Sequence, residues 1–166
     1  TYYSMEYIDG ISLDKKISQS PRGRMSLNEA IGTLKQIGAA IAFMHSLNML
    51  HLDVKPGNVM IRKDGTAVLI DFGLSKQYNP DGEPESSTKV GAGTSGYAPI
   101  EQANYHEGKG FPTMMDVYAL GGTLFKMLTG QRPPESSEIL NEGFFTDSLH
   151  QFLVPDYIIN SIAKAM

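Results

Sequence analysis

The fold and the chemistry of this chain are decided by one stretch, His51-Leu52-Asp53-Val54-Lys55-Pro56-Gly57-Asn58. Two short apolar runs follow it, at residues 59–61 and 67–70, and Lys63-Asp64-Gly65 between them is typical of a β-hairpin turn. The second run ends at Asp71-Phe72-Gly73. Polar side chains carried by neighbouring strand ends can converge on one point. We therefore expect both segments to contribute to one site in the loops beside the hairpin, where catalytic side chains are commonly placed.

Four side chains in these two segments have the chemistry of phosphoryl transfer. Asp53 and Asp71 offer carboxylates, Asn58 offers an amide oxygen, and Lys55 offers a positive charge. Transfer of a phosphoryl group needs a carboxylate that orients the attacking hydroxyl, and oxygen ligands for the Mg²⁺ that bridges the phosphates. A lysine close to the acid can offset charge on the transferring group. The pattern therefore predicts a phosphoryl-transfer site.

A long amphipathic helix is predicted before this stretch and a buried helix after it. Ser26 and Glu29 have the spacing of a capping box, and apolar residues then recur every three or four positions up to Leu47. The second helix is expected to begin with Thr113 as its N-cap and to run to Leu128. This second helix is apolar nearly all round, so we expect it in the middle of the domain.

Shorter elements are expected elsewhere in the chain. Residues 2–8 predict an aromatic-rich strand that ends at Asp9-Gly10, and residues 13–17 predict a short helix that leads into a loop at residues 20–24. Residues 79–96 are typical of a long polar loop, and the C-terminal part is typical of short helices separated by prolines. No internal repeat is present, so we expect one folded unit.

Composition excludes several classes of protein. The chain has 166 residues, of which 41% are hydrophobic, and a formal net charge of −4. This mildly acidic balance excludes a generic binder of the nucleic-acid backbone, which needs a dense basic face. The absence of cysteine excludes disulfides and thiolate metal sites. No apolar run is typical of a signal peptide or of a membrane span, so we expect a cytoplasmic protein.

Three blocks of sequence together resemble the protein kinase family. The family pattern H-R-D-x-K-P-x-x-N corresponds to residues 51–58, D-F-G to Asp71-Phe72-Gly73, and A-P-E to Ala98-Pro99-Ile100-Glu101 with one inserted residue. The order and spacing of the blocks agree with the family as well. Lys55 in its position is similar to the Ser/Thr-directed members, and not to the tyrosine kinases. The chain therefore resembles, from end to end, the C-terminal lobe of a eukaryotic-like Ser/Thr kinase of the bacterial type.

This resemblance implies a fold, a domain organisation and an activity. The fold would be an α+β, protein-kinase-like one, with a mainly helical C-lobe, a small β-hairpin and most of the N-lobe outside the chain. Residues 1–166 would be a protein kinase domain fragment that comprises the hinge and the C-lobe and is truncated at both ends. The activity would be transfer of the γ-phosphoryl group of ATP to Ser/Thr hydroxyls of protein substrates.

The resemblance also implies a role for each phosphoryl-transfer residue. Asp53 would be the catalytic base, and Lys55 would contact the phosphates of ATP. Asn58 and Asp71 would be the ligands of Mg²⁺ or Mn²⁺. Protein substrates, ATP and a divalent metal are therefore the expected partners and cofactors.

Further residues are implied to bind the nucleotide or to hold the site together. Residues 5–8 would be the hinge, with the main chain of Glu6 and Ile8 facing adenine. Thr94 matches a family position that packs against the base and shapes the substrate groove, and a simple turn hydroxyl is the alternative. The residues with expected structural or regulatory roles are His51, Phe72, Gly73, Thr94, Glu101 and Asp116.

Two of these residues have a specific structural expectation. His51 is expected to be a buried core histidine that stacks near Phe72, and not a general base. Asp116 is expected to accept hydrogen bonds from the backbone of the catalytic loop, because a buried acid must have hydrogen-bond partners.

One departure from the family concerns regulation. Leu52 stands where the family has an arginine that receives the phosphorylated activation loop, so a phosphate group would find no guanidinium at this site. Ser86, Ser87 and Thr88 are candidate phosphorylation sites in the polar loop, and ordinary exposed hydroxyls are the alternative. We hypothesise that activation-loop phosphorylation is not the main switch of the parent protein.

A second departure concerns the nucleotide. Within this chain, no glycine-rich phosphate loop and no V-A-I-K-type lysine precede the hinge. We therefore expect the chain by itself to bind ATP very weakly and to transfer no phosphate. The strand predicted at residues 2–8 would also have unpaired edges, which promote self-association.

Two other functions stay open at this point. A pseudokinase would bind partners as a scaffold without phosphotransfer, although the presence of Asp53, Lys55, Asn58 and Asp71 argues against such a loss. A small-molecule kinase of the aminoglycoside or choline type shares the pattern of acids and amide. Lys55 and residues 98–101 favour protein substrates, because both features resemble the peptide-docking end of protein kinases.

Overall fold

The structure is a computed structural model of the chain. The residues that it describes are 6–79, 85, 93–103, 112–144 and 146–166. The predictions made for residues 1–5 and for Ser86, Ser87 and Thr88 lie outside this part of the chain.

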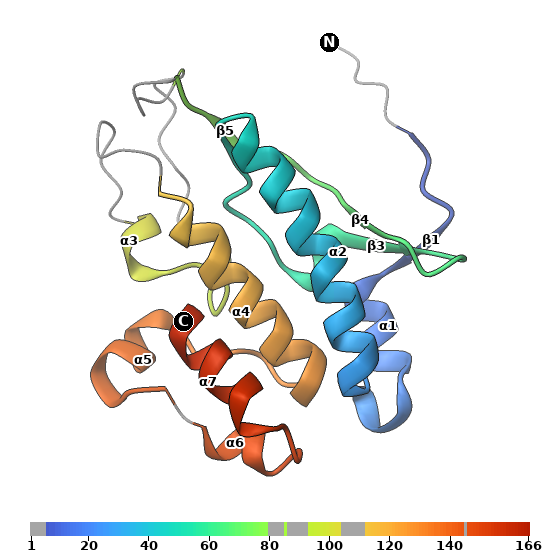
Figure 1. Ribbon diagram of the computed structural model, residues 1–166, viewed down its shortest axis with the longest axis vertical. Coiled ribbons are helices and arrows are strands. Elements are labelled where there is room, and N and C mark those ends of the chain that lie inside the picture. Colours follow the sequence, from blue (N-terminus) through green and yellow to red (C-terminus); the bar gives the residue numbers. More distant parts are fainter. Residues whose placement is uncertain (1–5, 80–84, 86–92, 104–111, 145) are drawn as a thin grey trace.

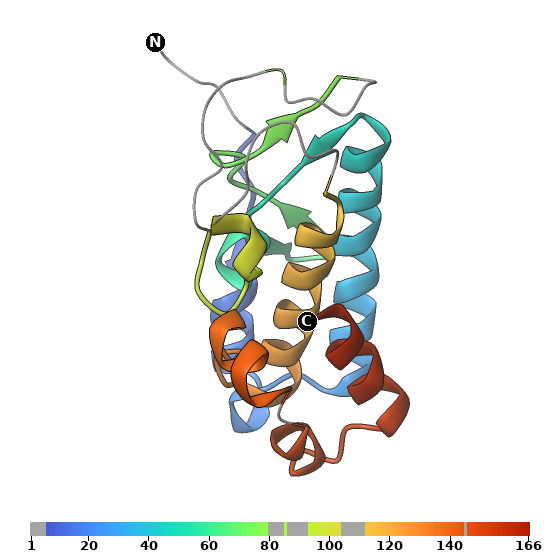
Figure 2. The same cartoon turned by 90° about the vertical axis from the view of Figure 1, so that its left-hand side faces the viewer.

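Helices pack beside two small antiparallel sheets (Figure 1, Figure 2). The helices are α1 (Leu13–Gln19), α2 (Leu27–Ser46), α3 (Ile100–Ala103), α4 (Met114–Thr129), α5 (Ser136–Glu142), α6 (Asp147–His150) and α7 (Asp156–Ala165), with 3-10 turns η1 (Pro21–Gly23) and η2 (Pro56–Asn58). The strands are β1 (Gly10–Ser12), β2 (Met49–Leu50), β3 (Val59–Arg62), β4 (Ala67–Leu69) and β5 (Lys76–Gln77). The mainly helical α+β fold predicted from the sequence is confirmed.

The helix α2 begins at the predicted capping box. The Glu29 N–H donates to the Ser26 hydroxyl at 3.4 Å, and the Ser26 N–H donates to Glu29 Oε2 at 3.3 Å. The hydrogen bond from the Ser26 hydroxyl is the largest cause that lowers the pKa of Glu29 from its usual value. One face of the helix is buried, with Ile37, Ile41 and Met44 among its residues, so the predicted amphipathic helix is confirmed.

The helix α4 lies between α2 and α7 and is the central helix of the fold (Figure 1). Most of its residues are buried, which confirms the prediction from its apolar composition. Thr113 is the N-cap residue of this helix, as predicted, but its backbone is already helical and its hydroxyl makes no hydrogen bond to an N–H of the first turn. The helix stops at Gly130, whose φ of 72° is in the left-handed region that favours glycine.

A three-stranded sheet in the order β1-β3-β4 carries the predicted hairpin. Ile61 of β3 pairs with Ala67 of β4 across the turn, where Gly65 has a φ of 87°. The predicted strand at residues 2–8 is wrong for its described residues 6–8, because β1 begins only at Gly10. Gly10 lies so close to the backbone carbonyl of Ile61 that any side chain at position 10 would collide with it. Because glycine has no side chain, the pairing of β1 with β3 can begin at this residue.

A second, two-stranded sheet lies beside residues 51–58, and it was not predicted from the sequence. The strand β2 leads directly into residues 51–58, and β5 follows residues 71–73 closely. Leu50 of β2 pairs with Lys76 of β5, and the Tyr78 N–H donates to the Asn48 carbonyl at 2.8 Å. This pairing brings the two segments with candidate catalytic residues to the same part of the molecule.

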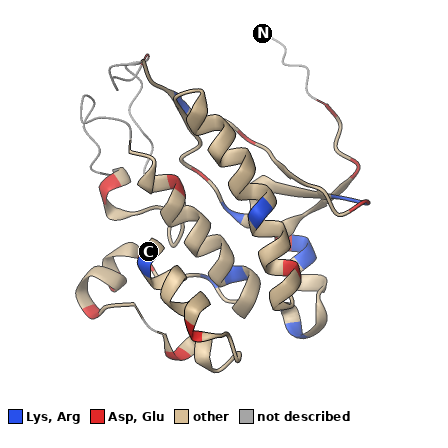
Figure 3. Cartoon of the chain, in the orientation of Figure 1, with Lys and Arg blue, Asp and Glu red and all other residues tan. Residues whose placement is uncertain are grey.

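Basic and acidic residues are scattered over several helices and loops (Figure 3). Among the described helices, none combines the length and the apolar character that crossing a membrane requires.

Candidate active site

Asp53 is the centre of a compact polar cluster at the C-terminal end of β2. Its Oδ2 accepts a hydrogen bond from Lys55 Nζ at 2.8 Å, and its Oδ1 accepts one from the Thr94 hydroxyl at 2.7 Å. Lys55 Nζ also donates to the Thr94 hydroxyl, at 2.7 Å. The Asp53 side chain is only 11% exposed, so these contacts are shielded from bulk water and stronger than surface ones.

Asn58 completes this arrangement, which we call the Asp53 cluster: Asp53, Lys55, Asn58 and Thr94. Its side-chain Nδ2 donates to the Asp53 carbonyl and to Asp53 Oδ2, both at 2.9 Å. The turn η2 makes this possible, because it folds residues 56–58 back over the loop and buries the Asn58 side chain. Both carboxylate oxygens of Asp53 are therefore held in place.

A buried acid, Asp116, holds the backbone of the loop that contains Asp53. Asp116, in the first turn of α4, is 0% exposed. It accepts hydrogen bonds from the His51 N–H at 3.0 Å and the Leu52 N–H at 2.8 Å, and its Oδ2 lies 2.8 Å from His45 Nε2 of α2. The N-terminus of a helix also favours a negative charge. Asp116 therefore connects α2 and α4 to the residues that precede Asp53.

Leu52 occupies its position in an unusual backbone conformation. Its φ is 66°, in the left-handed region that residues other than glycine seldom adopt. Its side chain is 2% exposed and packs in an apolar cluster with Leu50, Tyr78 and Met115. The site at which the family carries a guanidinium is therefore apolar and closed in this chain.

His51 is a buried structural histidine in this geometry. Its side chain is 0% exposed, and its ring centroid lies 5.4 Å from that of Phe72, as expected from the sequence. Burial is the largest cause that lowers the pKa of His51, so the ring is neutral at pH 7. Its Nδ1 accepts a hydrogen bond from the Asp53 N–H at 3.3 Å, which assigns the ring proton to Nε2.

Asp71 lies at the end of the hairpin. A backbone hydrogen bond links the residue before it to Asn58 of the Asp53 cluster. The Ile70 N–H donates to the Asn58 carbonyl at 2.9 Å, which joins the two segments directly. Asp71 has a φ of 63°, and its Oδ1 accepts a hydrogen bond from the Gly73 N–H at 3.2 Å. Asp71, Phe72 and Gly73 are exposed, so this edge of the site is open.

The residues at this edge fit a magnesium ion. Asn58 uses its Nδ2 for Asp53, so its amide oxygen stays available, and Asp71 offers a carboxylate at an exposed position. Mg²⁺ prefers oxygen ligands and commonly takes one or two from protein, with substrate phosphates and water supplying the others. Asn58 and Asp71 therefore carry oxygen atoms of the kind that Mg²⁺ prefers, and their role as its ligands stays a prediction.

The predicted hinge residues Glu6 and Ile8 make their described contacts outside the Asp53 cluster. Glu6 Oε1 accepts a hydrogen bond from Arg62 Nη2 of β3 at 2.7 Å, and its side chain is 70% exposed. Ile8 is half-buried. Within the described residues, no hydrogen bond joins Glu6 or Ile8 to the cluster.

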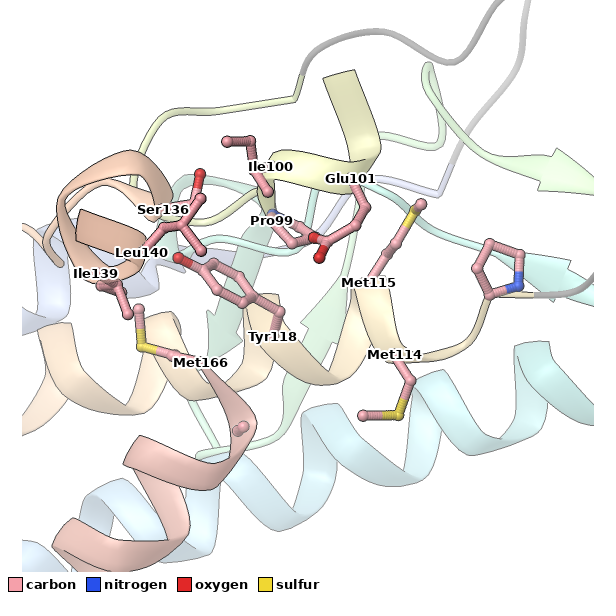
Figure 4. Close-up of a pocket in the computed structure, with 12 residues that line it drawn as sticks. Pro99, Ile100, Glu101, Met114, Met115, Tyr118, Ser136, Ile139, Leu140 and Met166 are labelled. Atoms are coloured by element: carbon pink, nitrogen blue, oxygen red, sulfur yellow. The ribbon is translucent and has the colours of Figure 1, made fainter. Parts of the chain in front are cut away.

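Glu101 also lies outside the Asp53 cluster. It lines a surface cavity of about 530 Å³ that α3, α4, α5 and α7 enclose with mainly apolar side chains (Figure 4). Tyr118 points into the same cavity, and burial, followed by the charge of Glu101, raises the pKa of Tyr118 to about 12. None of the four cluster residues lines this cavity, so it is separate from the candidate active site.

Two residues of the site were missed in the sequence analysis. His45 lies in an otherwise ordinary amphipathic helix, and no sequence signal marks its contact with Asp116. Gln102 follows Glu101 directly and donates from Nε2 to the Leu52 carbonyl at 2.7 Å, as a buried bond between α3 and the catalytic loop. Its place next to the A-P-E-like block was the only available signal.

The comparison with known families agrees with this geometry. The protein kinase domain matches residues 1–158, which is nearly the whole chain. The chain belongs to the protein kinase domain family.

Its relatives include serine/threonine kinases of bacteria. The chain is 35% identical over 132 residues to the serine/threonine-protein kinase PknA of Mycobacterium tuberculosis (strain ATCC 25177 / H37Ra), which covers 80% of the chain and 29% of that relative. It is 31% identical over 171 residues to the probable serine/threonine-protein kinase PknB of Lactococcus lactis subsp. lactis (strain IL1403), covering 99% of the chain and 26% of that relative. The chain thus spans less than a third of the length of these relatives.

Proposed function

We propose that the chain is the hinge and C-terminal lobe of an ATP-dependent protein serine/threonine kinase, which transfers the γ-phosphoryl group of ATP to Ser/Thr hydroxyls of proteins. One observation carries the proposal: Thr94 holds one carboxylate oxygen of Asp53, and Lys55 and Asn58 hold the other. A carboxylate fixed in this way can accept a proton from an incoming hydroxyl without losing its orientation. The family and the names of the relatives support the same activity.

In this reaction each residue of the site has a chemical task. Asp53 orients the substrate hydroxyl and accepts its proton while the oxygen attacks the γ-phosphorus, whose bond to the β,γ-bridging oxygen breaks so that ADP leaves. Lys55 lies beside the acid, where its positive charge offsets the negative charge of the transferring phosphoryl group. Asn58 and Asp71 hold Mg²⁺ or Mn²⁺, which when bound neutralises charge on the phosphates.

The nucleotide is proposed to bind between these residues and the hinge. In this proposal, as the family resemblance implies, the main chain of Glu6 and Ile8 faces adenine, while the Glu6 side chain is in an ion pair with Arg62. The chain alone is proposed to be inactive, since binding energy from the rest of a kinase domain is needed to fix the phosphates. The whole kinase is proposed to act in the cytoplasm.

The experiment is a phosphate-transfer assay with the full-length protein that contains this chain. Casein serves as a generic Ser/Thr-containing substrate, and labelled ATP with Mg²⁺ is the phosphate donor. Label on serine or threonine of casein is the expected result. A folded protein that binds a partner but transfers no label with Mg²⁺ or Mn²⁺ would contradict the proposal and favour a pseudokinase.

A further inference from the structure

Gln102 joins two parts of the site that are far apart in sequence. It belongs to α3, its side chain is 1% exposed, and its Nε2 donates to the backbone carbonyl of Leu52 at 2.7 Å. The two residues are 50 positions apart. A buried carbonyl without a hydrogen-bond donor destabilises the folded state, because its lost hydration is not replaced. The bond from Gln102 is therefore important for the local structure.

The peptide that Gln102 holds is the one that leads into Asp53. Leu52 has a φ of 66°, in the left-handed region that is unfavourable for a residue with a side chain. Asp116 Oδ1 accepts from its N–H at 2.8 Å, and Gln102 donates to its carbonyl. Leu52 is therefore fixed at both its N–H and its carbonyl group. The orientation of the backbone at the next residue, Asp53, depends on both hydrogen bonds.

The same amide also packs against the segment that carries Thr94. Gly93 has a φ of 69°, and a methyl group built on it would lie 2.7 Å from Gln102 Nε2 and 2.6 Å from the Ala98 side chain. Only glycine therefore fits against Gln102 at this position. The next residue, Thr94, makes the bonds to Asp53 and Lys55.

We propose that Gln102 is a positioning residue for phosphotransfer, which sets the placement of Asp53 through the Leu52 carbonyl and of Thr94 through Gly93. The inference rests on the proposed kinase function and deepens it. Gln102 touches no reacting atom, so it acts on the turnover step through the alignment of the base. A small misalignment of a catalytic group can lower a rate by about a hundredfold.

The first test is Gln102→Met, which keeps the length of the side chain and removes the donor. In the full-length kinase with casein and MgATP, we expect kcat to fall about 10–100-fold while KM for ATP changes less than about twofold. The matched control is Gln36→Met, because Gln36 also makes side-chain bonds to backbone, to Gly65 and Ala67 of the hairpin, and is exposed. We expect this control to keep its kcat.

The second test is Gln102→Glu, which keeps the shape and replaces the donor by a carboxylate. Burial raises the pKa of a carboxyl group, and the protonated acid regains a donor for the Leu52 carbonyl. The ratio of variant to wild-type kcat should therefore rise as the pH is lowered from 8 to 6. Because protonation of a buried carboxyl also restores stability, kcat is expressed per mole of folded protein measured at each pH. A role in stability alone then leaves the ratio independent of pH, and this variant also serves if Gln102→Met does not fold.

The outcomes separate this inference from the proposed function. Asp53→Asn is assayed beside the Gln102 variants. An active wild type with an inactive Asp53→Asn form and normal kcat in both Gln102 variants would overturn the positioning role alone. The positioning role would also be overturned by a second combination of results. In it, the activity of Gln102→Met falls only in proportion to its folded fraction, and the ratio of Gln102→Glu kcat to wild-type kcat does not change with pH. A wild type without activity would overturn the proposed function, and this inference with it.

Discussion

Thr94 donates a hydrogen bond from its hydroxyl to Asp53 Oδ1 at 2.7 Å, across 41 positions of sequence. The same hydroxyl accepts a hydrogen bond from Lys55 Nζ at 2.7 Å, and Lys55 lies 2.8 Å from the other oxygen of Asp53. The three groups close a triangle, so no one of them can move without disturbing the other two. Thr94 is therefore a bridge between the candidate base and the candidate phosphate contact, and not a turn hydroxyl alone.

Removal of this hydroxyl should slow phosphate transfer. A hydrogen bond to a charged group contributes about 1.5–3 kcal/mol, so Thr94→Ala is expected to lower kcat by about 10–100-fold. Thr94→Ser keeps the hydroxyl and is expected to stay within about threefold of the wild type. Steady-state kinetics of the full-length kinase with casein check both variants. Equal losses in the serine and alanine variants would show that the methyl group, and not the hydroxyl, matters.

The buried acid Asp116 should be needed for stability as well as for activity. Asp116→Asn replaces one acceptor oxygen with a donor that faces the N–H groups of His51 or Leu52, or the ring of His45. We expect a loss of about 3 kcal/mol in the free energy of unfolding, because removal of one partner from a buried charged network is costly. Thermal unfolding measures the change.

The control for this variant is Asp156→Asn at the start of α7. The Asp156 side chain is 85% exposed and lies 3.8 Å from His150, and such surface contacts contribute little. A change of less than about 0.5 kcal/mol is expected for it. Equal stability of the two variants would contradict the role of Asp116 as the anchor of the loop.

Activity should depend little on phosphorylation of the activation loop. Leu52 is buried among Leu50, Tyr78 and Met115, so a phosphate has no guanidinium to pair with at this position. A full-length kinase with Ser86, Ser87 and Thr88 all changed to alanine is expected to keep its kcat within about threefold. The comparison with phosphatase-treated and untreated wild type gives the same measurement by another route. A near-complete loss of activity in the triple variant would show that the hypothesis is wrong.

The capping box of α2 should make the stability of the fold depend on pH. Its hydrogen bonds lower the pKa of Glu29 in the folded state, so the ionised carboxylate is stabilised by folding. This contribution is present above the ordinary carboxyl pKa and is lost as the pH falls through the lowered value. Glu29→Gln should therefore reduce the free energy of unfolding by about 0.5–1 kcal/mol at pH 7, and by less at pH 3.

Urea unfolding of the wild type and of Glu29→Gln at both pH values checks this prediction. The exposed side chain of Glu142, at the end of α5, supplies the control Glu142→Gln, which is expected to change the free energy of unfolding by less than about 0.5 kcal/mol at both pH values. A difference between Glu29→Gln and the wild type that is the same at pH 7 and pH 3 would contradict the prediction.

Local signals in the sequence were sufficient for the main elements of the fold. The capping box of Ser26 and Glu29 and the Asp64-Gly65 turn each involve residues a few positions apart, and both elements appear where they were predicted. The residues of the Asp53 cluster were also identified, because their motif is contiguous except for Thr94. What these residues do chemically stays a prediction.

The remaining features depend on contacts between distant segments. The pairing of β2 with β5 joins strands of two residues each, which are too short to show a periodicity. The position of β1 was predicted wrongly because the close approach of Gly10 to Ile61 is set by the partner strand. The bond from Gln102 to Leu52 spans 50 positions, and the place of Gln102 beside the A-P-E-like block did not indicate its partner.

The most direct test of the account is the transfer of labelled phosphate by the Asp53→Asn form of the full-length kinase. Asparagine keeps the size of the side chain but cannot accept the proton of the substrate hydroxyl, so transfer to casein should fall by about 10²–10⁴-fold. MgATP binding, measured by calorimetry on the same samples, should change little. Transfer at the wild-type rate by the Asp53→Asn form would contradict the assignment of Asp53 as the catalytic base.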